Sequence, residues 1–163
     1  MTAAKPTPTR FRETVRALIL APDPAVLLIH MVFPDRDIWC TPGGGVAPGE
    51  SHQAALLREL HEEVGRADFD IGPHIWVREG TFNWRGESIA EREYFYLVRT
   101  DRFVADSSGN PVAHEREAMA ELKWWAVSDL PKRSRLFAPM RLGMLVADLL
   151  RDGTPPRPIN TGF

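Results

Sequence analysis

The sequence predicts an α/β fold in which a mixed β-sheet carries helices on its faces. Runs rich in β-branched and aromatic residues lie before, between and after two segments that repeat apolar residues at helical spacing. Helices packed on the faces of a sheet bury its apolar side chains, so this alternation favours a layered domain. With 163 residues, the chain is long enough for one domain with a substantial core.

The domain is expected to span residues 13–152, with no internal repeat and no linker. Residues 1–12 are polar and contain prolines, so we expect a flexible N-terminal arm. Residues 153–163 contain three prolines, and we expect an extended C-terminal tail.

The first elements are a pair of strands at 14–20 and 25–31. Both runs are rich in apolar and β-branched residues, and Pro22-Asp23-Pro24 between them predicts a hairpin turn. A polar loop at 33–38 and a short strand at 39–41 then lead into a loop of glycines.

A helix is expected between Ser51 and Gly65. Ser51 is a typical N-cap residue, and Gly65 stands where a glycine commonly ends a helix. Between them, Leu56, Leu60 and Val64 recur every four residues and predict one buried stripe.

Beyond this helix, further strands are expected at 71–80, 92–100 and 122–127, with a loop at 101–113. Residues 137–150 predict a second amphipathic helix. Its apolar positions at helical spacing are Phe137, Met140, Met144 and Ala147.

The first helix gathers three carboxylates on a second face, at Glu59, Glu62 and Glu63. Like charges at this spacing cost about 0.2–0.5 kcal/mol per pair, and the nearest cations are Arg58 and His61. Two interpretations account for the cluster: a solvated acidic face, or a site for a hard divalent cation. Magnesium prefers carboxylate oxygens and is usually shared with the phosphates of a substrate.

The loop before the helix is rich in glycine. Gly43, Gly44, Gly45 and Gly49 have no Cβ, so the backbone can approach a ligand or an ion closely. We therefore expect Gly43, Gly44 and Gly45 to contact substrate.

The spacing of these residues resembles a known motif. From Gly44, five residues lead to Glu50, seven more lead to Arg58-Glu59, and Glu62-Glu63 and Gly65 follow. This pattern resembles the Nudix box, G-x5-E-x7-R-E-U-x-E-E-x-G-U with U apolar, at residues 44–66. Arg66 departs from it, because the family has an aliphatic residue there.

The resemblance implies an α/β/α sandwich and a metal-dependent hydrolase. Nudix enzymes use Mg²⁺ or Mn²⁺ to cleave a phosphoanhydride bond in a nucleoside diphosphate linked to another group. Nucleotide sugars, oxidised nucleoside triphosphates and dinucleotides all remain open as substrates. The alternative is a non-catalytic sensor of Nudix fold that binds a nucleotide.

Matched position by position, the motif implies a metal site. The ligands would be Glu59, Glu63 and the Gly44 carbonyl, with Glu62 as a third carboxylate ligand or the base. Arg58 and Glu50 would orient the carboxylates, although a structural salt bridge explains them equally well.

Several relatives add a glutamate from outside the box as a ligand or base. Glu117 is our candidate for this catalytic role, and Glu115 and Glu121 are alternatives that the sequence does not separate.

Aromatic residues after the box suggest where a base could bind. Phe82 and Trp84, and also Trp76, could stack on a nucleobase, or they could belong to the core or its rim.

Composition limits the partners. The net charge of −2 gives no electrostatic footprint for duplex nucleic acid, and no apolar run is long enough to span a membrane. Cys40 is the only cysteine, so we expect a small packing residue beside Trp39 rather than a disulfide or a nucleophile. A cytoplasmic enzyme with a small nucleotide-derived substrate fits this composition, and a homodimer is left open.

Overall fold

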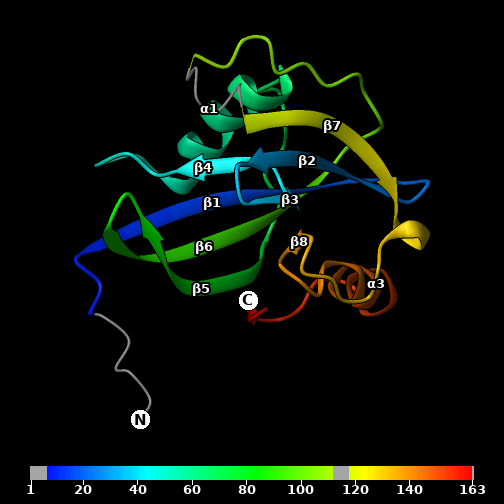
Figure 1. The fold of residues 1–163 in the computed structure, drawn as a ribbon. Coiled ribbons are helices and arrows are strands. Elements are labelled where there is room, and N and C mark those ends of the chain that lie inside the picture. The colour runs from blue at the N-terminus through cyan, green and yellow to red at the C-terminus, as the bar shows by residue number, and fades with distance from the viewer. Residues whose placement is uncertain (1–6, 112–117, 163) are drawn as a thin grey trace.

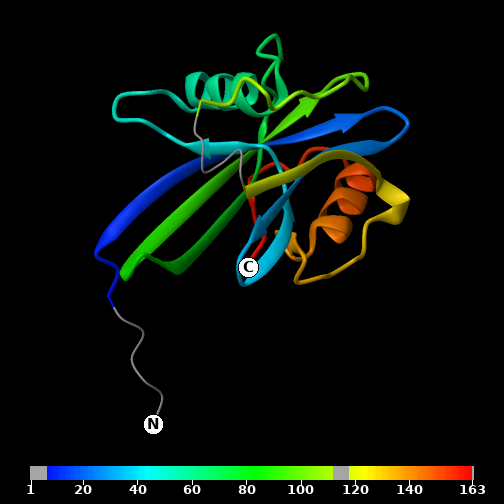
Figure 2. The ribbon, with the colours of Figure 1, turned by 45° about the horizontal axis from the view of Figure 1, so that its top comes forward.

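The computed structural model describes residues 7–111 and 118–162 and shows a curled mixed sheet with a helix on either side (Figures 1 and 2). Its strands are β1 (Arg10–Ala21), β2 (Ala25–Phe33), β3 (Arg36–Cys40), β4 (Gly43–Gly45), β5 (His74–Trp84), β6 (Glu87–Arg99), β7 (Met119–Ala126), β8 (Phe137–Ala138) and β9 (Ile159–Asn160). The helices are α1 (His52–Val64) and α3 (Leu142–Asp152), and η1 (Val127–Asp129) is a short 3-10 helix.

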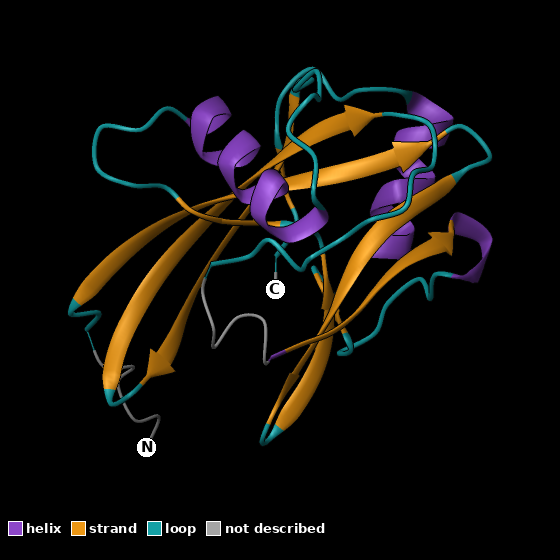
Figure 3. Cartoon of the chain, turned by 90° about the horizontal axis from the view of Figure 1, so that it is seen from above, coloured by secondary structure: helices purple, strands orange, loops and turns teal. Residues whose placement is uncertain are grey.

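Strand β1 lies at the centre of the sheet, whose order is β8-β3-β2-β1-β6-β5-β9. It pairs in parallel with β6 from Arg10 to Leu20, but it meets β2 only at Leu20 and Ala21. Strand β2 then diverges to pair with β3 and β7, so the sheet opens into two arms (Figure 3). Strand β4 pairs with β1 at Thr14–Arg16, where β2 has moved away.

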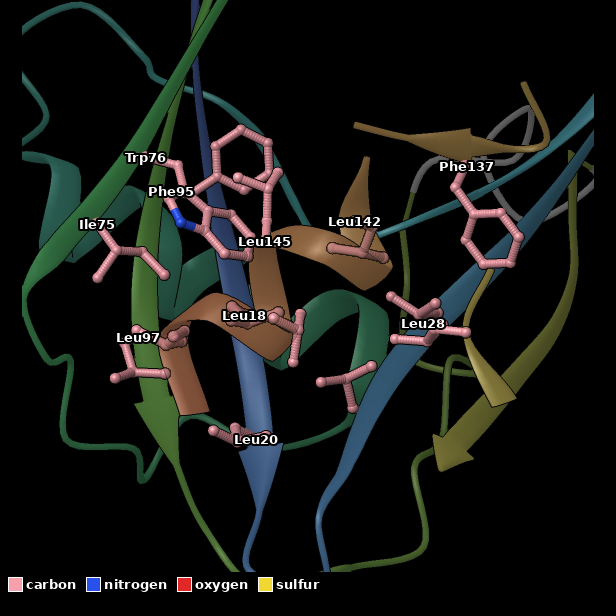
Figure 4. Close-up of a cluster of buried hydrophobic side chains, with 14 residues drawn as sticks. Leu18, Leu20, Leu28, Ile75, Trp76, Phe95, Leu97, Phe137, Leu142 and Leu145 are labelled. Carbon is pink, nitrogen blue, oxygen red and sulfur yellow. The ribbon is translucent and has the colours of Figure 1, made fainter. Parts of the chain in front are cut away.

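The two faces of the sheet bury separate cores because side chains alternate along each strand. On β1, Val15, Ala17 and Ile19 pack with α1, whereas Leu18 and Leu20 pack with α3. Figure 4 shows the core beneath α3. The expected α/β/α arrangement is therefore confirmed.

Several boundaries differ from the sequence expectation. Residues 10–12 are not part of the arm: they begin β1 and pair with Ile89–Glu91 of β6. Likewise, residues 36–38 of the expected loop belong to β3. In both cases the side chains are mostly polar and gave no strand pattern in the sequence, although backbone pairing does not require apolar residues. The tail contains β9, which pairs in parallel with β5 at Trp76 and Val77.

Strands β5 and β6 form a hairpin, and the strands expected at 71–80 and 92–100 left out its residues nearest the turn. Its turn is Arg85-Gly86, and both residues have positive φ, 49° and 82°. This conformation is typical of the tight turns that match the twist of a hairpin. Strand β5 therefore continues beyond Gly80 to Trp84, and β6 begins at Glu87 rather than Arg92.

Helix α3 is shorter than expected, and its apolar face is a different one. Phe137 belongs to β8, and Met144 and Ala147 are exposed. The buried residues at helical spacing are instead Leu142, Leu145, Val146 and Leu149. The two sets lie on nearly opposite sides of the helix axis, and both repeat at helical spacing, so the spacing alone did not show which one is buried.

Candidate active site

Helix α1 forms as its sequence predicts. The Ser51 hydroxyl accepts a hydrogen bond from the Ala54 N–H at 3.1 Å. At the other end, Gly65 has φ 83° and its N–H bonds to the His61 carbonyl. Leu56 and Leu60 are fully buried against the sheet. The second face of α1, which carries the glutamates, contacts β4.

That second face is packed against the glycine loop. The Gly43 N–H donates to Glu63 Oε2 at 2.8 Å. A Cβ on Gly44 would lie 2.3 Å from Glu59 Cδ, so the Glu59 carboxylate occupies the place of a side chain. Pairing of β4 with β1 holds the loop in this position. The box glycines and glutamates thus form one contiguous unit.

Burial separates the two interpretations of the acidic cluster. Glu59 and Glu63 are only 7% and 8% exposed, whereas Glu62 is half-buried. A solvated acidic face is therefore wrong for Glu59 and Glu63. Burying carboxylates costs free energy unless hydrogen bonds or cations compensate. Arg58 supplies part of this compensation, at 2.9 Å from Glu59 and 3.8 Å from Glu62.

Arg58 also ties the loop to the helix through Glu50. Its Nε and Nη2 donate to the two Glu50 carboxylate oxygens at 2.9 Å each, and Nη2 donates to the Gly45 carbonyl at 3.0 Å. The bond from Arg58, with one from the Ala47 N–H, lowers the pKa of Glu50 to about 2. The Glu50 contact in turn raises the pKa of Arg58. Glu50 and Arg58 therefore form a salt bridge, and Arg58 also contacts the Glu59 carboxylate, so the pair is compatible with both interpretations.

The donor set fits a hard divalent cation. Carboxylate oxygens from one helix face lie beside the carbonyl-rich glycine loop, which matches the preference of Mg²⁺ and Mn²⁺ for oxygen. In the described ranges, no three His, Cys, Asp or Glu side chains converge into a complete binding set. Water and phosphate oxygens would therefore complete the coordination, as is usual for Mg²⁺.

Sequence reasoning missed a buried charge cluster beside the loop. Glu93 on β6 accepts from Arg16 Nε at 3.1 Å and from Arg78 Nη1 at 2.5 Å. Burial favours the neutral form of Glu93, but Arg16 and Arg78 outweigh it and lower its pKa. These residues come from β1, β5 and β6, and the pairing register that joins them leaves no local signal in the sequence.

The single thiol is structural, as expected. Burial raises the pKa of Cys40 to about 11, although Arg16 acts in the opposite direction. The thiol is therefore protonated at neutral pH, which makes it a poor nucleophile.

The candidate aromatic residues have different environments. Trp76 is buried and packs on Phe95 at 5.8 Å, so it belongs to the core. Phe82 is half-buried, and Trp84 is 47% exposed with Arg85 5.6 Å above its ring. Both lie toward the tip of the β5–β6 hairpin, which projects away from α1 (Figures 2 and 3). The structure does not bring Trp84 to the box.

Of the glutamates outside the box, Glu115 and Glu117 lie outside the described residues. Glu121 is exposed on β7, where it pairs with His30 of β2. Its role as a ligand or base stays a prediction.

The sequence matches the model of the NUDIX domain family over residues 10–142. The chain therefore belongs to the Nudix family. An RNA pyrophosphohydrolase of Erythrobacter litoralis (strain HTCC2594) is 30% identical over 63% of this chain, which spans 66% of that relative's length. A Nudix hydrolase of Bacillus subtilis (strain 168), YvcI, is 31% identical over 74% of this chain and 70% of its own.

Solved structures agree on the fold. The E. coli ORF135 protein superposes with a TM-score of 0.60 and 24% identity, covering 91% of this chain and 96% of that one. The NUDIX domain of Shewanella oneidensis NrtR, complexed with ADP ribose, has a TM-score of 0.62 and 19% identity, over 85% and 87% of the two chains. Both α1 and α3 are too short or too polar to cross a bilayer, as is every helix in the described ranges.

Proposed function

We propose that this chain is a metal-dependent pyrophosphohydrolase acting on a nucleoside diphosphate joined to another group. The observation that supports this most directly is the packing of Glu59 and Glu63 against Gly44 and Gly43. Buried carboxylates packed against a backbone loop that contains carbonyl oxygens suit an ion shared with phosphate. The name of the Erythrobacter litoralis relative supports the cleavage of a pyrophosphate bond.

The charge of the substrate explains why an ion is needed. A polyphosphate is strongly anionic, so Glu59, Glu62 and Glu63 would repel it without a cation between them. When bound, Mg²⁺ or Mn²⁺ would act as a Lewis acid on a phosphoryl oxygen and lower the pKa of a bound water. The ligands in this proposal are Glu59, Glu63 and the Gly44 carbonyl.

The remaining box residues would position these groups and take up a proton. Glu62 is the most accessible carboxylate of the helix face, so it is placed to act as the third ligand or to accept a proton from water. Arg58 holds Glu59 in place, and Glu50 holds Arg58. Catalysis would then depend on Arg58 through the orientation of the carboxylates.

A hydrolysis screen tests the proposal. The purified chain with Mg²⁺ would be incubated with a nucleotide sugar, a dinucleoside polyphosphate, an oxidised nucleoside triphosphate and a 5′-triphosphorylated RNA, and the products would be identified by mass spectrometry. We expect cleavage of a phosphoanhydride bond in at least one substrate. Binding without cleavage of any of them would instead support the nucleotide sensor.

Substitutions at the ligands make the screen specific to the site. Glu59→Gln and Glu63→Gln should each lower the rate by more than about 100-fold, because an amide is a poor substitute for a charged oxygen ligand. Glu79→Gln is the matched control, because Glu79 is an exposed carboxylate that pairs with Arg92 on the hairpin. Near-normal turnover of both box variants at saturating Mg²⁺ would contradict the assignment.

A further inference from the structure

A buried network leads from the middle of the sheet to the glycine loop. It begins at Glu93, whose side chain is only 6% exposed and which bridges Arg16 at 3.1 Å and Arg78 at 2.5 Å. A carboxylate shared by two guanidinium groups fixes both of them, because each would lose a charged partner by turning away. Glu93 therefore holds the Arg16 side chain in one orientation beneath the loop.

The other end of Arg16 faces the loop backbone. Its Nη1 lies 3.4 Å from both the Thr41 and the Gly43 carbonyl oxygens. Pro42 lies between these residues, and its carbonyl accepts from the Ala17 N–H at 2.8 Å. The turn into the glycine loop is thus held by consecutive contacts from β1.

Gly43 needs such support because its own conformational preference is weak. It has φ 150°, a value that side chains of L residues rarely allow, and it has no side chain to restrict rotation. Its orientation is set by the groups that bond to it, namely Arg16 at its carbonyl and Glu63 at its N–H. The N–H and the carbonyl of Gly43 belong to two consecutive peptide groups, so the two contacts together restrict its φ and ψ.

We propose that Arg16, held by Glu93, is a positioning residue that places the Glu63 carboxylate through the backbone of Gly43. The inference rests on the proposed function of the box, since Glu63 is one of the proposed metal ligands. Arg16 touches neither substrate nor metal in this proposal. Its effect is to fix the Glu63 carboxylate, which it reaches only through Gly43.

Two substitutions separate positioning from simple stabilisation. Arg16→Lys keeps the charge, but a single ammonium cannot bridge Glu93 and both carbonyls in a fixed plane. Glu93→Gln keeps the shape and weakens the hold on Arg16. The matched control is Glu91→Gln: Glu91 lies two residues earlier on the same face of β6 and bonds to the Thr14 hydroxyl at 2.6 Å.

The first measurement needs neither metal nor substrate. Amide hydrogen exchange and the NMR shift of the Gly43 N–H report its bond to Glu63 directly. We expect faster exchange and a changed shift in Arg16→Lys and Glu93→Gln, and a wild-type amide in Glu91→Gln. An unchanged Gly43 amide in both test variants would overturn the proposal.

The second measurement is the affinity of the protein for Mn²⁺ without substrate, which electron paramagnetic resonance reports from the signal of free Mn²⁺. Loss of a group that orients a ligand typically weakens metal binding about 10–100-fold, and we expect at least about a tenfold rise in the dissociation constant for both test variants. The melting temperature of each variant would be recorded beside it. If Glu91→Gln binds Mn²⁺ as weakly as Glu93→Gln does, the loss of affinity reflects general destabilisation. That result would contradict the proposal.

The proposal stays testable if a variant fails to fold or if the wild type has no metal site. If Glu93→Gln does not fold, Glu93→Asp keeps the charge but shortens its reach, and it should still disturb the Gly43 amide. If wild-type protein neither binds Mn²⁺ nor hydrolyses any nucleotide, the proposed function fails. The Gly43 amide then still decides whether Arg16 places Glu63.

Discussion

At the scale of single residues, Gly43 and Gly44 lack side chains for two different physical reasons. A Cβ on Gly43 would lie 2.0 Å from the Val15 carbonyl oxygen, which belongs to the rigid backbone of β1. A Cβ on Gly44 would instead meet the end of the Glu59 side chain, which can swing aside. The first glycine is needed by the fold, and the second by the site.

This difference predicts that two alanine substitutions affect different properties, stability in one case and activity in the other. Gly43→Ala should lower the free energy of unfolding by about 1–3 kcal/mol, because it adds backbone strain to the collision. Gly44→Ala should leave the melting temperature close to wild type but lower hydrolysis at least about tenfold, because Glu59 is displaced. Thermal melts and hydrolysis rates check both effects, and a fully active Gly44→Ala would contradict the account.

The Glu50–Arg58 pair predicts a defined dependence on pH. The Arg58 bond lowers the pKa of Glu50 from 4.5 to about 2, so the pair stabilises the fold fully above pH 4.5. This stabilisation is lost as the pH falls from 4.5 toward 2. Wild type should therefore melt above Glu50→Gln at pH 6, the difference should be smaller at pH 3, and the two melting temperatures should converge only below about pH 2. A difference in melting temperature that stays constant across this pH range would show that the Glu50–Arg58 pair does not contribute to the pH dependence of stability.

At the scale of elements, the sequence predicted those whose signals are local. Helix α1 has a cap, a stop and a clear stripe, and all of these appear in the structure. For α3, two apolar patterns on opposite faces compete, and burial against the sheet selects Leu145 over Met144. The strand β3 and the start of β1 are polar, so their formation depends on pairing partners that periodicity cannot show.

The corrected face of α3 can be tested with two neighbouring residues. Leu145→Ala removes a buried side chain and should cost about 2–5 kcal/mol of unfolding free energy. Met144→Ala changes an exposed position and should stay within about 0.5 kcal/mol. Urea unfolding measures both. The reverse order would restore the face that includes Met140 and Met144.

At the scale of the whole molecule, strand β1 connects the fold to the site. It contributes to both cores, pairs with the glycine loop, and supplies Arg16 beneath that loop. The box itself was predictable because its residues lie within 23 positions of each other. The Arg16–Glu93–Arg78 cluster was not, because 77 residues separate Arg16 from Glu93 and only the register of β1 with β6 brings them together.

The central claim is that the buried carboxylates of α1 form a metal site, and the melting temperature tests it without knowledge of the substrate. An ion that binds only the folded state at a hundredfold excess over its dissociation constant adds about 2.7 kcal/mol. For a chain of this size, that corresponds to about 5–10 °C. Mg²⁺ should therefore raise the wild-type melting temperature well beyond Na⁺ at the same ionic strength, and Glu63→Gln should lose most of this increment. Equal shifts with Mg²⁺ and Na⁺ in the wild type would contradict the claim.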